Sequence, residues 1–288
     1  MLRKLAPALV APLLIVSACA SESDGASVDV RTGEGAITAL RSAPAAAAEA
    51  GTASFETTME VALEGETFEV VGTGAYDADN QRMTMEMDLG SALAGLGAAG
   101  EGAPDEPMQM VVDGSTVYLR APLFELLGGE DTWLSLSAED LGGTASDLGL
   151  GSGSYDPSKI LDSLRGVTGE PEAVGTETVR GVETTRYSAD LDLAQAVDEA
   201  PEDQREVIEA QLDQLGETSI SVDVWVDDDG LVRRMQLDLG GMLGGTATLT
   251  IELFDYGQPV DIEVPSPDDV RSLTDGLGIF GDGLAQAS

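Results

Sequence analysis

The sequence predicts an α+β fold built mainly on antiparallel β-sheet. From Thr52 onward most of the chain alternates apolar and polar residues, which is the period of a strand with one buried face. Turn residues such as Asp113-Gly114 separate these runs at hairpin spacing. A few other segments change to the spacing of an amphipathic helix. We therefore expect about ten strands and three or four helices in one domain.

The chain enters the sheet after a helical segment. Residues 28–49 contain Ile37, Leu40 and several alanines, a pattern that predicts a helix packed on the sheet. The apolar parity of the first strand then holds Ala53, Phe55, Met59, Val61 and Leu63. The same parity of the next strand holds Phe68, Val70, Gly72, Gly74 and Tyr76. A two-residue turn at Gly65-Glu66 would pair Leu63 with Phe68 and Val61 with Val70.

The third and fourth strands carry methionine on the same face. The third run holds Met83, Met85, Met87 and Leu89. A turn at Asp79-Asn80 sets Met85 opposite Gly74 and Met87 opposite Gly72, because a one-residue slip would turn every apolar side chain to water. Asp113-Gly114 predicts a further hairpin that pairs Met110 with Val117 and Met108 with Leu119.

The second half of the chain repeats this pattern. Residues 133–136 predict a short strand, residues 156–164 a short helix that begins at Asp156-Pro157, and residues 171–191 two strands. The spacing is helical over residues 193–215, where Pro201 divides the segment. The last strands carry apolar residues of one parity: Ile220, Val222, Val224, Val226, Leu231, Met235, Leu237, Leu239, Leu249, Ile251 and Leu253.

The turn at residues 227–230 decides where Arg233 lies. A four-residue loop pairs Val226 with Leu231 and Val222 with Met235, and it places Arg233 on the apolar face opposite Val224. The three aspartates of this loop resemble a calcium site, but an EF-hand loop needs a glutamate at position twelve and this chain has Asp238 there. A hairpin turn explains these residues without a metal, so we predict no metal site.

The first residues predict export. Arg3 and Lys4 precede an apolar run, Leu5–Val16, which is too short for a membrane-spanning helix and is interrupted by prolines. Residues 1–18 are therefore predicted to be a signal peptide. Val16-Ser17-Ala18-Cys19 resembles the bacterial lipobox, which implies a diacylated Cys19 as the first mature residue; an unmodified buried thiol is the alternative. We predict a lipidated tether over residues 19–27, the domain over residues 28–271 and a C-terminal tail over residues 272–288.

Composition excludes several classes of function. The chain has 53 Asp and Glu against 14 Lys and Arg, a formal net charge of −39, and nucleic acid is therefore not expected as a partner. It has no histidine and one cysteine, which excludes Ser-His-Asp and Cys-His catalysis and an internal disulfide. A zinc site would need carboxylates alone, which is unusual. We expect no enzyme and no cofactor.

The methionines and two glycines define the candidate site. Methionine is flexible and polarizable, and it fills gaps or lines surfaces that adapt to apolar ligands. Inward-facing strand glycines leave room for a ligand or for the protein's own side chains, and both alternatives stand at this point. The candidate lining is Phe55, Met59, Val61, Phe68, Val70, Gly72, Gly74, Met83, Met85, Met87, Met108, Met110, Val222, Val224, Arg233 and Met235.

The chain resembles the actinobacterial LppX/LprG-type lipoproteins, which share the shape of the lipoprotein carrier LolA. The lipobox with Cys19, the hairpin VWVDDDGLVRR at residues 224–234 and the ending YGQPVDI at residues 256–262 carry the resemblance, in matching order over most of residues 28–271. The resemblance implies a strongly curved antiparallel sheet, an unclosed half-barrel, with helices over its concave face. It also implies an apolar cavity that holds acyl chains.

The leading hypothesis is a non-enzymatic lipoprotein, exported and anchored to the outer face of the cell membrane. It would bind the acyl chains of an envelope lipid or lipoglycan and carry them between the membrane and the outer envelope, with Arg233 contacting an anionic head group. Envelope transporters or other envelope proteins are its expected protein partners. The alternative is an envelope scaffold or assembly factor that binds proteins and whose core is filled by its own side chains.

Overall fold

The computed structural model describes residues 33–63, 65–90, 107–121, 132–137, 161, 164, 167–192, 219–240 and 245–272. The predicted signal peptide, the tether, the helical segment 193–215 and the tail beyond residue 272 lie outside these residues. The described part contains the helix α1 (Gly33–Ala50), the short 3-10 helix η4 (Pro267–Asp269) and one sheet of twelve strands.

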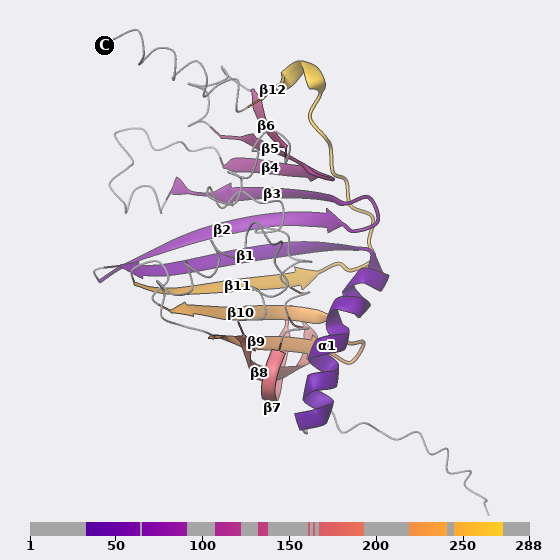
Figure 1. Ribbon diagram of the computed structural model, residues 1–288, viewed down its shortest axis with the longest axis vertical. Coiled ribbons are helices and arrows are strands. Elements are labelled where there is room, and N and C mark those ends of the chain that lie inside the picture. Colours follow the sequence, from indigo (N-terminus) through magenta and orange to yellow (C-terminus); the bar gives the residue numbers. More distant parts are fainter. Residues whose placement is uncertain are drawn as a thin grey trace, which may run out of the picture.

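The sheet is open and almost wholly antiparallel (Figure 1). Its strands are β1 (Thr52–Leu63), β2 (Glu66–Asp77), β3 (Arg82–Asp88), β4 (Met108–Asp113), β5 (Thr116–Arg120), β6 (Trp133–Ser137), β7 (Val167–Val179), β8 (Val182–Asp192), β9 (Ser219–Asp227), β10 (Val232–Gly240), β11 (Thr246–Phe254) and β12 (Val270–Ser272). Their order is β12-β6-β5-β4-β3-β2-β1-β11-β10-β9-β8-β7, and only β12 pairs parallel, with β6. The two ends of the sheet do not meet, so the predicted unclosed α+β architecture is confirmed.

The helix α1 packs on the sheet through small residues. Ala36, Leu40, Ala43 and Ala47 are all at most 4% exposed and recur every three or four residues. Alanine at three of these positions lets the helix approach β7, β9 and β1 closely. Gly51, with φ of +76°, ends the helix and donates its N–H to the Ala47 carbonyl. The helix predicted over residues 28–49 is thus confirmed from Gly33 onward.

The register of the first hairpins agrees with the prediction in one case and differs in two. Met85 lies opposite Gly74 and Met87 opposite Gly72, as predicted. The predicted pairings of Val61 with Val70 and of Met110 with Val117 are wrong: Val61 lies opposite Phe68, and Met110 opposite Leu119.

The physical reason lies in the turn glycines. Gly65 has a φ of +93° and Gly114 a φ of +59°, both in the left-handed region that glycine adopts readily. Gly65 directly precedes β2, and Gly114 directly follows β4, so each glycine lies in a two-residue turn. Each register is displaced by two residues from the prediction. Because side chains alternate with period two, this displacement leaves every side chain on its predicted face, and the apolar pattern could not distinguish the two registers.

The hairpin between β9 and β10 also differs, and it moves Arg233. Met235 lies opposite Val224, and the register shifts between Val232 and Arg234. Arg233 is therefore the residue of a bulge, and the prediction that it lies on the apolar face opposite Val224 is wrong. Its Nε donates to Asp227 Oδ2 at 2.6 Å, and its guanidinium lies 5.2 Å from the centre of the Tyr256 ring. The Asp227 carboxylate holds Arg233 there.

The outer face of β8 to β11 is covered by ion pairs and ring contacts. The guanidinium carbons of Arg186 and Arg234 lie 5.0 and 5.3 Å from the centre of the Trp225 ring. The indole N–H of Trp225 donates to Glu177 Oε2 at 3.0 Å. Glu252 accepts hydrogen bonds from Arg234 and from Arg180. These contacts link strands that are far apart in the sequence.

Glu252→Gln is expected to lower the free energy of unfolding by about 1–2 kcal/mol at pH 7. Burial raises the pKa of Glu252, but hydrogen bonds and charges from Arg234 and Arg180 outweigh it, so the net pKa lies below the ordinary value of 4.5. The folded state thus favours the ionised carboxylate. The contribution of Glu252 to the free energy of unfolding is therefore present above pH 4.5, and it disappears as the pH falls through the lowered pKa of the folded state. Urea denaturation at several pH values measures this.

Glu60→Gln is the matched control, because Glu60 is exposed and lies on the same outer face of the sheet, on the neighbouring strand β1. It is expected to change stability by less than about 0.5 kcal/mol. Equal losses in the two variants would contradict a specific role for Glu252.

Candidate functional site

The structure gathers the predicted site residues, Arg233 excepted, on one apolar face of the sheet. Cross-strand pairing arranges them in rows that run across the strands. One row holds Leu253, Phe55, Gly74, Met85, Met110, Leu119 and Leu134. A second holds Tyr187, Val224, Met235, Ile251, Thr57, Gly72, Met87 and Met108. A third row holds Val222, Leu237, Leu249, Met59 and Val70. A fourth holds Ala247, Val61 and Phe68. A fifth holds Ala53, Tyr76, Met83, Val112, Val117 and Leu136.

Burial divides this face into a closed part and an open part. The closed part is at most 4% exposed and contains Phe55, Met83, Met85, Met110, Val222, Val224 and Met235. The open part is only half-buried and contains Met59, Val61, Phe68, Val70, Met87 and Met108. Because α1 leads into the start of β1, the open part lies toward the other end of that strand, near the β1–β2 turn (Figure 1).

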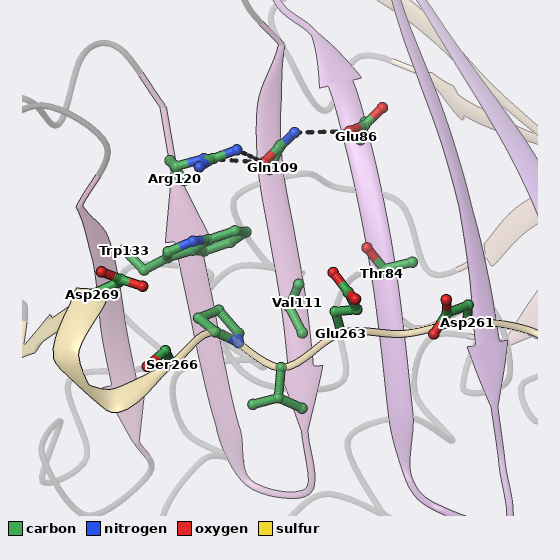
Figure 2. A pocket seen from close by; sticks show the side chains of 12 residues that line it. Thr84, Glu86, Gln109, Val111, Arg120, Trp133, Asp261, Glu263, Ser266 and Asp269 are labelled. Atoms are coloured by element: carbon green, nitrogen blue, oxygen red, sulfur yellow. Dashed lines mark hydrogen bonds between the residues drawn. The ribbon is translucent and has the colours of Figure 1, made fainter.

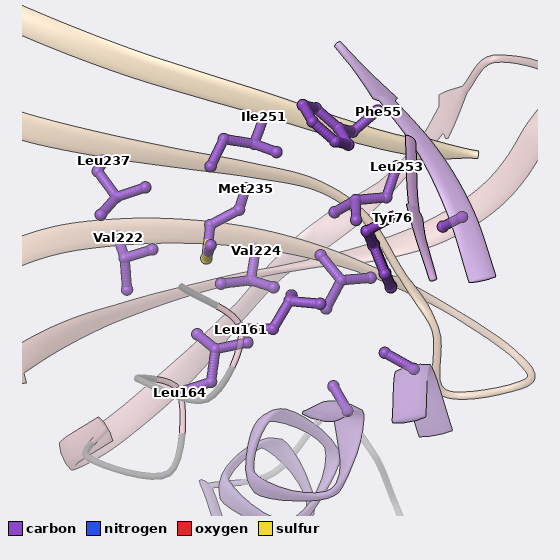
Figure 3. Packing of buried hydrophobic residues seen from close by; sticks show 14 of the residues in the cluster. Phe55, Tyr76, Leu161, Leu164, Val222, Val224, Met235, Leu237, Ile251 and Leu253 are labelled. Carbon is purple, nitrogen blue, oxygen red and sulfur yellow. The ribbon is translucent and has the colours of Figure 1, made fainter. Parts of the chain in front are cut away.

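A second layer covers the closed part beside β9 and β10. Leu161 and Leu164 come from the predicted helix at residues 156–164, and they are 1% and 0% exposed. Both belong to the same cluster as Val222, Val224 and Met235 (Figure 3). These two leucines were not predicted as site residues, although their spacing of three residues is typical of a buried helix face.

The room beside the two inward glycines is filled by the protein itself. A Cβ on Gly74 would lie 2.5 Å from the tip of the Phe55 ring and 2.2 Å from the Thr84 carbonyl oxygen. A Cβ on Gly72 would lie 2.7 Å from the Thr57 hydroxyl and 3.1 Å from Met87 Cγ. Of the two alternatives for the glycines, the structure therefore favours the protein's own side chains, and at Gly74 the filling group is an aromatic ring.

Strand β11 contributes to the face in a way that the sequence analysis missed. Leu249 lies opposite Met59, and it is half-buried like the open part. The alternation of β11 was recognised, but local pattern does not show that it pairs with β1, some 190 residues earlier in the chain.

The described ranges contain neither a cluster of metal-binding side chains nor a membrane-spanning helix. In that part of the chain no three Asp, Glu or Cys side chains come close enough together to hold a metal ion. The helices placed there include none with the length and apolarity to cross a membrane.

An open antiparallel sheet with one apolar face and a helix packed against it is an unclosed half-barrel architecture. Residues 135–262 match the model of the LppX_LprAFG lipoprotein family, and the resemblance predicted from the sequence is confirmed over that stretch.

The chain is also similar to individual proteins. It is 33% identical over 151 residues to an uncharacterized 31.2 kDa protein from Streptomyces griseus, a match that covers 49% of this chain and 48% of that protein. The chain therefore aligns with about half the length of this relative. Lipoprotein LppX from Mycobacterium tuberculosis superposes with a TM-score of 0.47 at 14% identity, over 79% of this chain and 97% of that one. LprF from Mycobacterium bovis superposes with a TM-score of 0.47 at 17% identity, over 82% and 99%.

Proposed function

We propose that the open part of the apolar face binds acyl chains of an envelope lipid and that the protein is a non-enzymatic lipid-binding lipoprotein. The half-buried row of Met59, Val70 and Leu249 carries the proposal, because it continues the closed core without being covered to the same extent. Each methylene removed from water contributes about 0.8 kcal/mol, so even part of an acyl chain on this surface gains several kcal/mol. Flexible methionines adapt to chains of different length.

The proposal extends to where the protein works. A diacylated Cys19 would anchor the chain stably in the cell membrane, since two acyl chains hold a protein where one holds it only marginally. The tether at residues 19–27 would then keep the apolar face close to the membrane that supplies the lipid. The family match supports this location, and transfer of the lipid toward the outer envelope is the finer part of the proposal.

The second candidate is a scaffold or assembly factor that binds envelope proteins. The ring of Phe55 against Gly74 favours it, because this part of the face is already filled. The two candidates differ in what the open part does: a lipid carrier takes up acyl chains there, whereas a scaffold does not.

Native mass spectrometry tests the proposal with a chain that carries Cys19→Ala, after incubation with phosphatidylethanolamine and phosphatidylglycerol vesicles. We expect bound lipid. Met87→Glu places a carboxylate on the open part and is expected to lower lipid occupancy at least about tenfold, since burying an unpaired charge costs more than about 1.4 kcal/mol.

Val174→Glu is the control, because this valine lies on β7 and is 55% exposed, well away from the open part. It is expected to leave lipid occupancy unchanged. A protein that carries no lipid after the incubation, or a Met87→Glu variant that carries as much as the unmodified chain, would overturn the proposal.

A further inference from the structure

A polar pocket of about 500 Å³ lies on the outer face of the sheet, opposite the apolar face. Its floor is formed by outward residues of β3 to β6, and its wall is the C-terminal strap, residues 259–269, which crosses these strands (Figure 2). The strap is held at both ends. The Thr52 hydroxyl donates to the Gln258 carbonyl at 2.7 Å just before it, and β12 pairs with β6 just after it.

The charge of the pocket is strongly negative. Four carboxylates line it, Glu86 on the sheet and Asp261, Glu263 and Asp269 on the strap, together with one guanidinium, that of Arg120. The three strap carboxylates form neither an ion pair nor a side-chain hydrogen bond with any residue that the structure describes. Within the same residues they do not converge with other acids into a metal site. Separated carboxylates of this kind suit several spaced cations rather than one ion.

The pocket also contains a positioned hydrogen-bond donor. Arg120 donates from Nε and Nη2 to Gln109 Oε1 at 3.1 and 2.6 Å, and Gln109 donates in turn to Glu86 at 2.8 Å. The guanidinium lies 5.0 Å from the centre of the Trp133 ring. A guanidinium has five N–H donors, so this arrangement fixes the group and leaves other donors for a ligand.

Arg120 differs in this respect from other arginines of the described sheet. Arg82, Arg180, Arg186 and Arg234 each form an ion pair with a carboxylate. Arg120, in contrast, has a neutral amide as its partner among the described residues. Its remaining donors match a neutral acceptor such as a peptide carbonyl, which the surrounding carboxylates do not repel.

We propose that this pocket binds a basic, extended peptide segment of a partner protein. Lysine or arginine side chains of the segment lie among Glu86, Asp261 and Glu263, a main-chain carbonyl accepts from Arg120, and aliphatic side chains pack on Trp133. The site is on the face opposite the acyl-chain surface. It therefore goes beyond the proposed lipid binding, and both ligands can be present together.

Fluorescence anisotropy with labelled hexalysine, at about 0.15 M salt to screen long-range attraction, tests the proposal on the full chain carrying Cys19→Ala. The double variant Asp261→Asn/Glu263→Gln is expected to weaken binding at least about tenfold. The control, Glu66→Gln/Glu183→Gln, makes the same change in net charge at two exposed carboxylates outside the pocket and is expected to stay within about twofold of the unmodified chain.

Arg120→Gln separates a peptide from other cations. It is expected to weaken hexalysine binding but not spermine binding, because spermine has no carbonyl to lose and is no longer repelled by the guanidinium charge. Circular dichroism confirms that each variant is folded. Equal losses in the two double variants would show attraction by the whole acidic surface, and spermine binding as tight as that of hexalysine would show a site for polyamines. Either result, or no hexalysine binding, overturns the proposal, and none of them bears on lipid uptake.

Discussion

Phe55→Ala is expected to lower the free energy of unfolding by about 3–5 kcal/mol. The ring is fully buried, and it fills the space that Gly74 leaves on the neighbouring strand. Truncation removes the apolar contacts and leaves a cavity between β1 and β2 that the backbone cannot close, because both strands are held by ladders on both sides. Urea denaturation followed by circular dichroism measures the change.

Phe68→Ala is the matched control, since Phe68 is the same residue type on the same face of the adjacent strand but only half-buried. It is expected to cost less than about half as much, and to lower lipid occupancy in the experiment proposed above. Comparable losses of stability in the two variants would mean that the division into a closed and an open part is wrong.

Asp227→Ala is expected to lower the free energy of unfolding by about 3 kcal/mol. The side chain is 4% exposed, and it accepts from the backbone N–H groups of Asp229 and Leu231, each at 2.9 Å, and from Arg233 Nε. Its removal leaves the two turn amides without an acceptor and the guanidinium of Arg233, 17% exposed, without its counter-charge.

Asp228→Ala in the same turn is the control for Asp227, because Asp228 is exposed. It is expected to change stability by less than about 0.5 kcal/mol. Asp227→Asn keeps one acceptor oxygen, so its loss in the free energy of unfolding is expected to lie between the losses of Asp227→Ala and Asp228→Ala. The same denaturation experiment measures all three, and a loss for Asp227→Ala no larger than that for Asp228→Ala would show that the carboxylate does not hold this hairpin.

The two faces of the sheet are suited to different partners. The inner face is apolar, and its open part leaves methionine and phenylalanine side chains half-exposed. The outer face combines ion pairs on β8 to β11 with the acidic pocket beneath the C-terminal strap. A protein tethered to a membrane could thus hold a lipid on one face while a partner protein contacts the other, which is the arrangement that the two proposals together predict.

The sequence by itself determined which apolar side chains of the strands face inward. Alternation with period two assigned Phe55, Met85 and Val224 to the apolar face, and the structure buries all three. Helical spacing at Ile37 and Leu40 indicated α1, and the missing histidines excluded the common catalytic arrangements. These features are local, because each depends on residues that are close together in the chain.

Only the tertiary structure decided the exact register of the strands and the contacts between distant segments. Two of the predicted hairpin registers were displaced by two residues, a change that the period cannot detect. The structure also places Arg233 in a bulge, where its Nε donates to Asp227. The filling of Gly74 by Phe55 follows from the pairing of β1 with β2. The acidic pocket exists because residues 259–269 cross strands that come more than 100 residues earlier in the chain, and no local pattern encodes such a contact.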